Sequence, residues 1–429
     1  MNKCLIIGSG IAGLNAASIL SSKKFPVTIL ESSPKFGGRT YSYKDPDSND
    51  MIDNGQHILM GCYDDTINFL KLVRAEKNFN FQNYLEVNFL TSDRKEYSIK
   101  ASSLFYPLNL LAAVLNYNVL DFMDKLRLIG FMLKLPFISR GSLKNISVST
   151  WLVEQNQNDR IIKALWEILC VGALNTSTDK ASAEMFHNIL MKIFFAGNKA
   201  SRIILPKLGL TESVIDPALA FINSNNGKII CSETVKEFLI EEDKVVAVKS
   251  ENNMYNGYDF IISTIPFHAL TKIKNSEKLN IDLNLSYSTI LNIHLWLSEI
   301  RLDEKFYGLI NSEIHWIFNK GSHLNIVISD ANKFAEVSEE KMIDLVFEEL
   351  EKFTSIKRKF LTKYKIIREK RATFIPNSEI LNKRPSTKTN LNNLFLAGDW
   401  TNTGLPATIE GAAKSGRLAA EQVISSVNS

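Results

Sequence analysis

The chain has 429 residues, of which 45% are hydrophobic and 22% are charged. This length exceeds what one hydrophobic core usually supports, so we expect two domains. The 50 basic and 46 acidic residues nearly balance, giving a net charge of +4, and the sequence has no basic stripe interleaved with aromatic residues. Nucleic acid is therefore excluded as a partner.

Four cysteines, Cys4, Cys62, Cys170 and Cys231, are widely spaced and form neither a C-x-x-C pair nor a cluster with histidine. We therefore expect no dithiol relay and no bound metal, and the pattern is typical of a reducing compartment. The first apolar segment leaves no room for a signal peptide, and no apolar run has the length needed to cross a bilayer. The expected location is cytoplasmic.

An apolar strand at residues 4–7 runs into a glycine-rich turn at residues 8–13, which opens a predicted helix. Gly8 allows the tight turn, Gly10 lets the backbone approach a pyrophosphate, and Gly13 lets the helix pack closely on the strand. A diphosphate would then meet the free N–H groups at the helix N-terminus. Strand, turn and helix in this order predict a dinucleotide site.

The next strand, at residues 27–30, ends at the acidic residue Glu31. A carboxylate in this position accepts hydrogen bonds from the adenosine ribose hydroxyls and repels a 2′-phosphate. NADP is therefore disfavoured as the occupant. Only this one glycine fingerprint follows a strand, so we expect no second nucleotide domain.

Two more signatures lie beyond the fingerprint. Gly37-Gly38-Arg39 follows Glu31, and an apolar strand at residues 394–396 leads into Gly398-Asp399. Together these features resemble the flavoprotein superfamily of amine oxidases and carotenoid desaturases. The resemblance implies an FAD cofactor, with Gly38 close to it, Arg39 near its phosphates and Asp399 on its ribityl chain and pyrophosphate.

Four segments carry a narrower resemblance, at residues 52–63, 173–183, 371–374 and 404–411. They are similar to the squalene-associated flavoprotein desaturases, which are hydroxysqualene dehydroxylases of hopanoid and triterpenoid biosynthesis. The resemblance implies a hydrophobic isoprenoid substrate and reductive loss of its hydroxyl group. Because the single glycine fingerprint is then taken by FAD, the electrons must come from an unidentified donor such as a reductase or free reduced flavin. Two alternatives stay open: an oxidative carotenoid desaturase or amine oxidase, and a non-catalytic isoprenoid carrier, against which the retained cofactor residues argue.

The expected fold class is α/β, with a discontinuous Rossmann-like FAD-binding domain of the glutathione-reductase-2 type and a discontinuous α+β substrate domain. We assign residues 1–62, 205–266 and 386–429 to the FAD-binding domain. Residues 63–204, expected to be mostly helical and to form a cap, and residues 267–385, expected to form longer strands, make up the substrate domain. A hairpin is predicted across residues 241–244.

Apolar residues recur every three or four positions between Ser103 and Phe137, which predicts amphipathic helices within the cap. These helices either pack internally and line an apolar tunnel, or lie in a membrane interface. The second alternative would make the protein peripheral to the inner face of the cytoplasmic membrane, with basic side chains toward anionic lipid. Those basic residues are Lys125, Arg127, Lys134, Arg140 and Lys144.

Other site residues follow from the resemblance. His57 lies in a loop that the family places near the flavin ring, where it either donates a proton to a leaving hydroxyl group or is structural. Asp53 is a general acid or a turn cap, and Trp296, Trp316 and Trp400 either wall the flavin or belong to the core.

The predicted helix from Pro406 to Val423 would direct its first N–H groups, from about Ala407 to Ile409, at the negative charge of a reduced flavin. The resemblance implies that Val235 contacts the adenine through its backbone N–H and C=O groups. The expected cofactor-binding residues are Gly8, Gly10, Ile11, Ala12, Gly13, Glu31, Ser32, Gly38, Arg39, Val235, Gly398, Asp399, Ala407, Thr408 and Ile409.

Overall fold

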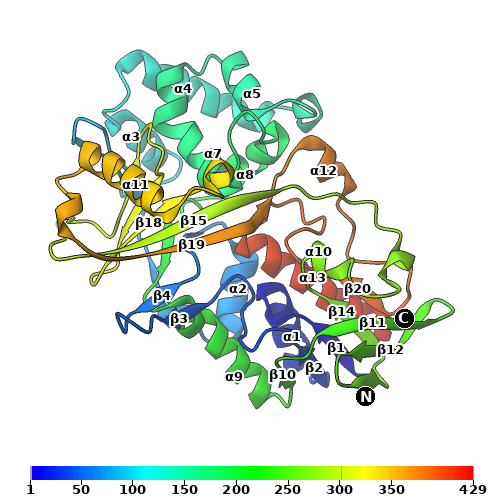
Figure 1. Ribbon diagram of the computed structural model, residues 1–429. Coiled ribbons are helices and arrows are strands. Elements are labelled where there is room, and N and C mark those ends of the chain that lie inside the picture. The colour runs from blue at the N-terminus through cyan, green and yellow to red at the C-terminus, as the bar shows by residue number, and fades with distance from the viewer. Residues whose placement is uncertain (1, 301, 429) are drawn as a thin grey trace.

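Five short strands from distant parts of the chain form a parallel sheet in the order β10-β2-β1-β14-β20. The computed structural model describes residues 2–300 and 302–428, and both chain ends lie beside this sheet (Figure 1). Alternate side chains point to opposite faces, and both faces are apolar and covered. The strands are β1 (Cys4–Ile7), β2 (Val27–Leu30), β10 (Lys228–Ile230), β14 (Phe260–Ser263) and β20 (Leu394–Leu396).

Helices cover one face of the parallel sheet, where they share a core with Ile6 and Ile29 of the strands. Phe69 and Leu70 of α2 are buried in the same core. This core therefore continues beyond residue 62, where the sequence places the start of the substrate domain. The helices are α1 (Ile11–Ser22), α2 (Asp64–Leu72), α9 (Asp216–Ser224) and α13 (Ile409–Asn428).

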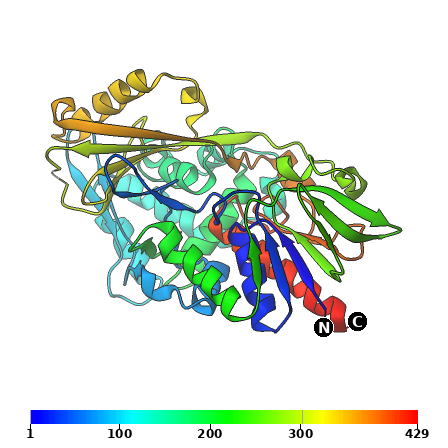
Figure 2. The ribbon, with the colours of Figure 1, turned by 60° about the horizontal axis from the view of Figure 1, so that its bottom comes forward.

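A three-stranded antiparallel sheet covers the other face, as Figure 2 shows. Its Phe238 and Val248 pack against Leu5 and Ile7 of β1. The hairpin predicted across residues 241–244 is confirmed, because the first strand of this sheet ends at Glu241 and the second begins at Lys244. The strands are β11 (Val235–Glu241), β12 (Lys244–Ser250) and β13 (Met254–Asn256).

A mixed sheet of seven strands, in the order β19-β15-β18-β17-β16-β7-β8, crosses the molecule between the cap helices and the parallel sheet (Figure 1). Met342 and Val346 of α11 pack on one face of this sheet, against Ile293 and Ile326. Its elements are β7 (Glu86–Leu90), β8 (Glu96–Lys100), β15 (Tyr287–Leu297), β16 (Phe306–Leu309), β17 (Trp316–Asn319), β18 (Leu324–Ile328), β19 (Leu361–Phe374) and α11 (Glu339–Phe353).

Three strands lie in a stretch that the sequence predicts to be mostly helical, so that prediction is wrong for residues 79–100. β6 (Phe79–Phe81) pairs with β9 (Ile203–Pro206), and β7 pairs with β16, more than 200 residues away. Partners this distant leave little local signal in the sequence. The β7–β8 hairpin is local and was also not predicted. Short strands complete the sheets: β3 (Ser42–Lys44) with β4 (Met51–Asp53), and β5 (Leu59–Met60) with β9.

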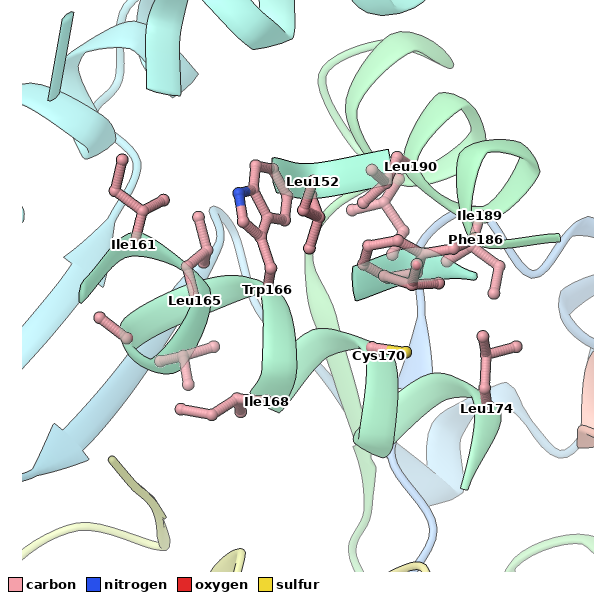
Figure 3. Packing of buried hydrophobic residues seen from close by; sticks show 14 of the residues in the cluster. Leu152, Ile161, Leu165, Trp166, Ile168, Cys170, Leu174, Phe186, Ile189 and Leu190 are labelled. Carbon is pink, nitrogen blue, oxygen red and sulfur yellow. The ribbon is translucent and has the colours of Figure 1, made fainter. Parts of the chain in front are cut away.

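Helices between residues 108 and 195 form the cap, as predicted. Phe131, Trp151, Trp166 and Phe186 meet edge to face in its core, with ring centroids 5.2 to 6.3 Å apart. Figure 3 shows Trp166 and Phe186 among the surrounding aliphatic side chains. The cap helices are α3 (Leu108–Asn116), α4 (Phe122–Lys134), α5 (Val148–Glu154), α6 (Asp159–Ile161), α7 (Glu167–Leu174) and α8 (Ala183–Phe195).

Candidate functional site

The glycine turn between β1 and α1 has the geometry that the sequence predicts. Gly8 has a φ of +103°, and a Cβ on it would come within 2.7 Å of Thr264 Oγ1. A Cβ on Gly13 would lie 2.1 Å from the carbonyl oxygen of Gly8, so only glycine lets the helix approach the strand this closely. A Cβ on Gly10 would meet no atom within 4 Å. The turn therefore presents bare backbone to open space, as a bound diphosphate requires.

The carboxylate of Glu31 is held at the end of β2 by its neighbours. It accepts hydrogen bonds from the N–H and hydroxyl of Ser9, at 2.9 and 2.7 Å, and from the N–H of Ser33 at 2.9 Å. The Ser32 hydroxyl lies 3.3 Å from the same carboxylate, a longer contact that a ribose hydroxyl can replace. Glu31 is thus fixed beside the glycine turn, where a ribose acceptor is needed.

Arg39 and Asp399 meet although 360 positions separate them in the sequence. Their Nη2 and Oδ2 atoms lie 2.7 Å apart, and Arg39 also donates to the carbonyl oxygen of Ala372 at 2.6 Å. The Asp399 carboxylate raises the pKa of Arg39. The guanidinium group therefore stays charged at the mouth of the glycine turn, which suits an anionic ligand.

Helix α13 begins at Ile409, three residues later than the sequence predicts. Thr408 caps it, because the Thr408 hydroxyl accepts from the N–H of Gly411 at 3.1 Å. The Thr408 N–H is used in a turn with Pro406, so the prediction that it is free for the flavin is wrong. Among the described residues, the N–H groups of Ile409 and Glu410 have no backbone or side-chain acceptor.

Arg384 holds the segment between β20 and α13, a role that the sequence analysis missed. Its buried guanidinium donates to the carbonyl oxygens of Asp399 at 2.8 Å and Leu405 at 2.7 Å, and also to that of Thr401. Burial lowers the pKa of Arg384 to about 10. No local motif marks this residue, since its partners are backbone atoms of a segment 15 to 21 residues away.

These elements surround one cavity of about 550 Å³, which runs from the glycine turn past His57 to the cap. Polar groups line it near the turn, and aliphatic and aromatic side chains line it beneath the cap. The predicted residues on its wall are Gly8, Gly10, Ile11, Ala12, Glu31, Ser32, Gly38, Arg39, His57, Gly398, Asp399, Ala407, Thr408 and Ile409. Its apolar part includes Leu110, Val114, Met132, Leu165, Ile168, Phe194, Trp316 and Val327.

Two of the expected cofactor-binding residues, Gly13 and Val235, are not on this wall. Gly13 acts through the close packing of α1 on β1. Val235 is buried in the core between the parallel sheet and β11, two residues after Glu233, whose N–H donates to the backbone oxygen of Glu31 at 2.8 Å. The start of β11 therefore lies beside Glu31, and the adenine contact of Val235 stays a prediction.

The three tryptophans differ in whether they line the cavity. Trp316 and Trp400 line the cavity. Trp296 does not: its ring stacks on His323, and its N–H donates to Asp50 at 2.6 Å. Trp296 therefore belongs to a polar cluster with His323 and Asp50 and does not wall the flavin.

His57 faces the cavity, whereas Asp53 is buried beneath it. Burial lowers the pKa of His57 to about 4, so its imidazole is neutral at neutral pH. Asp53 accepts from the Ser42 hydroxyl at 2.7 Å and the Leu210 N–H at 3.0 Å, and it pairs with Lys320 at 3.3 Å. These contacts make Asp53 an anchor between segments, and neither predicted role, general acid or turn cap, describes it.

Asn292 and Gln56 are two of the polar residues on the cavity wall that were not predicted. Asn292 on β15 accepts from the N–H of Gln56 at 3.2 Å, and both line the cavity. The sequence carries a signal for Asn292, because it alternates with His294 in an otherwise apolar strand. Among residues 2–300 and 302–428, no group of three or more His, Cys, Asp or Glu side chains is arranged to hold a metal ion.

A model of the family described as "flavin containing amine oxidoreductase" matches residues 11–424. The chain belongs to this family. Among curated relatives, it is 28% identical to a hydroxysqualene dehydroxylase of Zymomonas mobilis, over 98% of each chain. It is 27% identical to a hydroxysqualene dehydroxylase of Rhodopseudomonas palustris, over 98% of this chain and 97% of the relative. It is 24% identical to a 15-cis-phytoene desaturase of Synechococcus elongatus, over 98% and 95%.

Solved structures share the fold of this amine oxidoreductase. An oxidoreductase from Methanosarcina mazei has a TM-score of 0.74 at 19% identity, covering 99% of this chain and 100% of its own. A putrescine oxidase bound to putrescine has a TM-score of 0.70 at 13% identity, covering 99% of each chain. At identities this low, these TM-scores establish a common fold and nothing further.

As a flavin-containing amine oxidoreductase, the protein is an FAD-dependent oxidoreductase. Its cavity fits this cofactor: the bare backbone at Gly10 leaves room for the pyrophosphate, Glu31 is set to accept from the ribose, and the Arg39–Asp399 pair adjoins the turn. The unpaired N–H of Ile409 gives the N-terminus of α13 a positive end within the same cavity.

Proposed function

We propose that this enzyme removes the hydroxyl group of hydroxysqualene reductively and releases squalene. One observation carries the proposal: the apolar part of the cavity, beneath the cap, is continuous with the part lined by the predicted flavin-binding residues. A long hydrocarbon substrate needs such a tunnel to bring its reacting carbon to the cofactor. The similarity to two named hydroxysqualene dehydroxylases, over nearly the full length, supports the same substrate.

The hydroxyl-bearing carbon of hydroxysqualene is allylic, so protonation of its oxygen lets it leave as water and spreads the resulting positive charge over the double bond. When bound and reduced, FAD supplies the hydride that replaces the hydroxyl group. The apolar side chains beneath the cap exclude water, which would otherwise capture the cation. Trp316 on the cavity wall presents an aromatic face that favours a nearby cation.

We assign to His57 the donation of a proton to the departing oxygen. Because its imidazole is neutral at neutral pH, it acts as an N–H donor or through a water rather than as a standing imidazolium. Replacing it by glutamine keeps a polar group but removes proton exchange. We expect His57→Gln to slow dehydroxylation about 100-fold, within the range of general acid catalysis, at unchanged flavin content; an unchanged rate would remove His57 from the mechanism.

Two parallel incubations test the reaction. Chemically reduced enzyme receives hydroxysqualene without oxygen, oxidised enzyme receives phytoene, and both extracts are analysed by mass spectrometry. Squalene, with one flavin oxidised per product, supports dehydroxylation. A conjugated polyene from phytoene, with no squalene in the first incubation, would overturn the proposal in favour of desaturation.

We also propose that the outer face of the cap contacts a membrane surface, from which the substrate enters. Within residues 2–300 and 302–428, no helix has the length and apolar character of a membrane span. Large apolar side chains are nevertheless exposed on α3, α4 and the segments beside them. They are Leu104, Phe105, Leu108, Leu111, Leu115, Phe122, Met123, Leu126, Leu133 and Phe137, the last of which is 88% exposed.

Basic residues accompany this apolar face. Lys134 and Arg140 are exposed on either side of Phe137, and Lys144 follows in the same segment. An apolar face with cations at its edge is typical of proteins that lie in the interface of anionic membranes. Leu110 and Val114 of α3 line the cavity, so α3 connects this face with the tunnel.

Co-sedimentation with lipid vesicles tests the membrane contact. We expect binding to vesicles with anionic lipid, weaker binding to neutral ones, and loss of binding in Leu133→Ser/Phe137→Ser. Met254→Ser is the matched control, because Met254 is 50% exposed on β13, outside the cap. Equal binding of the double variant and the control would contradict the proposal.

A further inference from the structure

Two buried histidines form a hydrogen-bonded pair on the face of the seven-stranded sheet that also carries the cavity wall. His294 Nδ1 and His323 Nε2 lie 3.1 Å apart, and their side chains are 0% and 2% exposed. Asn292, two positions before His294 on β15, lines the cavity. Side chains two apart on a strand share a face, so the pair is next to the cavity wall.

The outer end of the pair reaches solvent. His323 Nδ1 lies 3.0 Å from the hydroxyl of Ser322, which is exposed. Trp296 holds the His323 ring by stacking on it, with centroids 4.9 Å apart, and its own N–H is bound to Asp50. Each nitrogen of His323 therefore has a partner that can pass or take a proton.

The inner end lies against the segment that carries His57. His294 Nε2 is buried and faces the backbone of Asp53 without a well-formed hydrogen bond. Asn325, directly opposite His294 in the β15–β18 ladder, has neither amide atom paired, and Gln56 Oε1 is also buried and unpaired. A buried polar group without a hydrogen-bond partner is unfavourable, so these groups are suited to bind a water molecule.

We propose that Ser322, His323 and His294 form a proton relay from solvent to the cavity, and that a buried water bound by His294 Nε2, Asn325 and Gln56 is its last member. This inference rests on the proposed dehydroxylation, which consumes a proton in a cavity that excludes solvent. The relay supplies that proton without opening the cavity to water.

The transfer balances without leaving charge in the sheet. His294 gives its Nε2 proton to the buried water, and that water gives a proton to one ring nitrogen of His57. The other ring nitrogen of His57 gives its proton to the departing hydroxyl group, which leaves as water. His294 Nδ1 then takes the proton of His323 Nε2, and His323 Nδ1 takes the proton of the Ser322 hydroxyl, which solvent replaces. Each ring exchanges one N–H for the other, and one solvent proton is consumed.

The surroundings favour neutral rings. Burial lowers the pKa of His294 to about 3 and that of His323 to about 4. Asp53 and Lys320 act on both rings with opposite sign, and Asp50 and Asp45 act on His323. Neutral imidazoles can exchange tautomers, whereas a fixed imidazolium would hold its proton.

His294→Gln and His323→Gln test the relay, because an amide keeps hydrogen bonds but does not exchange tautomers. We expect each to lower kcat about tenfold or more, with KM and flavin content retained, and added imidazole to restore part of the loss. His315→Asn is the control: His315 lies on the same sheet, accepts from the Ser329 N–H at 3.1 Å, and has no place in the relay. Variants with the activity of the control would overturn the inference.

Two measurements on the wild-type holoenzyme need no relay variant. Product formation in single turnovers should show a solvent deuterium isotope effect with a curved proton inventory, since several protons move together; an isotope effect of one would overturn the relay.

In ¹⁵N spectra of histidine-labelled protein, His294 and His323 should appear as neutral, hydrogen-bonded rings at pH values where free imidazole is charged. A titrating pair would contradict the inference.

The outcomes separate this inference from the proposed function. If wild-type enzyme makes no squalene, the dehydroxylation fails and the relay falls with it. If wild-type enzyme makes squalene and the glutamine variants match the control, the function stands and the relay alone is wrong.

Discussion

At the scale of single residues, two charged side chains on the cavity wall, Arg39 and Asp399, are already paired in the protein. Asp399 is 10% exposed and Arg39 is 38% exposed in their ion pair, so the pair is anchored at Asp399 and open at Arg39. Arg384 holds the backbone of Asp399 from behind. The carboxylate is thus fixed before the cofactor binds, which reduces the ordering that binding requires.

Removing Asp399 should therefore weaken FAD retention. Asp399→Ala leaves Arg39 without its partner and removes an acceptor for the cofactor, and we expect FAD affinity to fall at least about tenfold, the equivalent of about 1.4 kcal/mol. Flavin absorbance after gel filtration, compared with protein concentration, measures the loss. Asp45→Asn is the control, because Asp45 pairs with Lys363 and Lys365 and is not on the cavity wall; equal flavin loss in both variants would contradict the assignment.

The flavin should be held without a covalent bond. No Cys or His follows Asp399 in this chain, and none of its four cysteines lines the cavity. Acid precipitation of the holoenzyme should release all yellow colour into the supernatant. Flavin remaining in the washed pellet would refute this prediction.

At the scale of elements, one carboxylate joins two helices. Glu410, in the first turn of α13, accepts from the N–H groups of Asp65 and Thr66, at 3.1 and 2.8 Å, and from the Thr66 hydroxyl at 2.8 Å. It therefore caps the N-terminus of α2, which lacks a cap from its own sequence. This contact fixes α2 against the helix whose first turn lines the cavity.

Glu410→Ala should destabilise the protein by about 1–3 kcal/mol, because two buried N–H groups lose their acceptor. Urea unfolding of the holoenzyme should show the lower midpoint. Glu421→Ala on the same helix is the control, since Glu421 makes a surface pair with Arg417 and should cost less than about 1 kcal/mol. Equal midpoints for the two variants would show that the cap contributes nothing.

At the scale of the whole molecule, neutral buried histidines make stability depend on pH. Burial lowers the pKa values of His57, His315 and His323 to about 4 and that of His294 to about 3, below the ordinary 6.5. As pH falls below 6.5, these histidines bind protons in the unfolded chain but stay neutral in the folded protein. Stability should therefore be retained above pH 6.5 and fall progressively toward pH 4.

Thermal unfolding across this pH range measures the effect. Each of these histidines contributes a slope of up to about 1.4 kcal/mol per pH unit, so Tm should drop steadily from pH 6.5 to 4. His315→Asn should make this drop shallower, because it removes one buried titrating ring. A Tm independent of pH over the window would contradict the burial of these rings.

The sequence by itself determined the features that depend on neighbouring residues. The glycine turn, Glu31 and the Gly398-Asp399 pair each depend only on the local order of strand, turn and helix. Their geometry can therefore be predicted from the sequence. Apolar residues at every third or fourth position likewise predicted helices in the cap, and the pattern of neighbouring strands predicted the β11–β12 hairpin.

Only the tertiary structure decided what depends on contacts between distant segments. Strand β7 forms a local hairpin with β8 and also pairs with β16, more than 200 residues away. Helix α2 joins the FAD-binding core through Phe69 and Leu70, and Arg39 pairs with Asp399 across 360 positions. His294 and His323 meet because β15 and β18 pair, which aligns residues that no spacing rule connects. Long-range pairing is a cooperative property of the whole core, and a local sequence pattern cannot contain it.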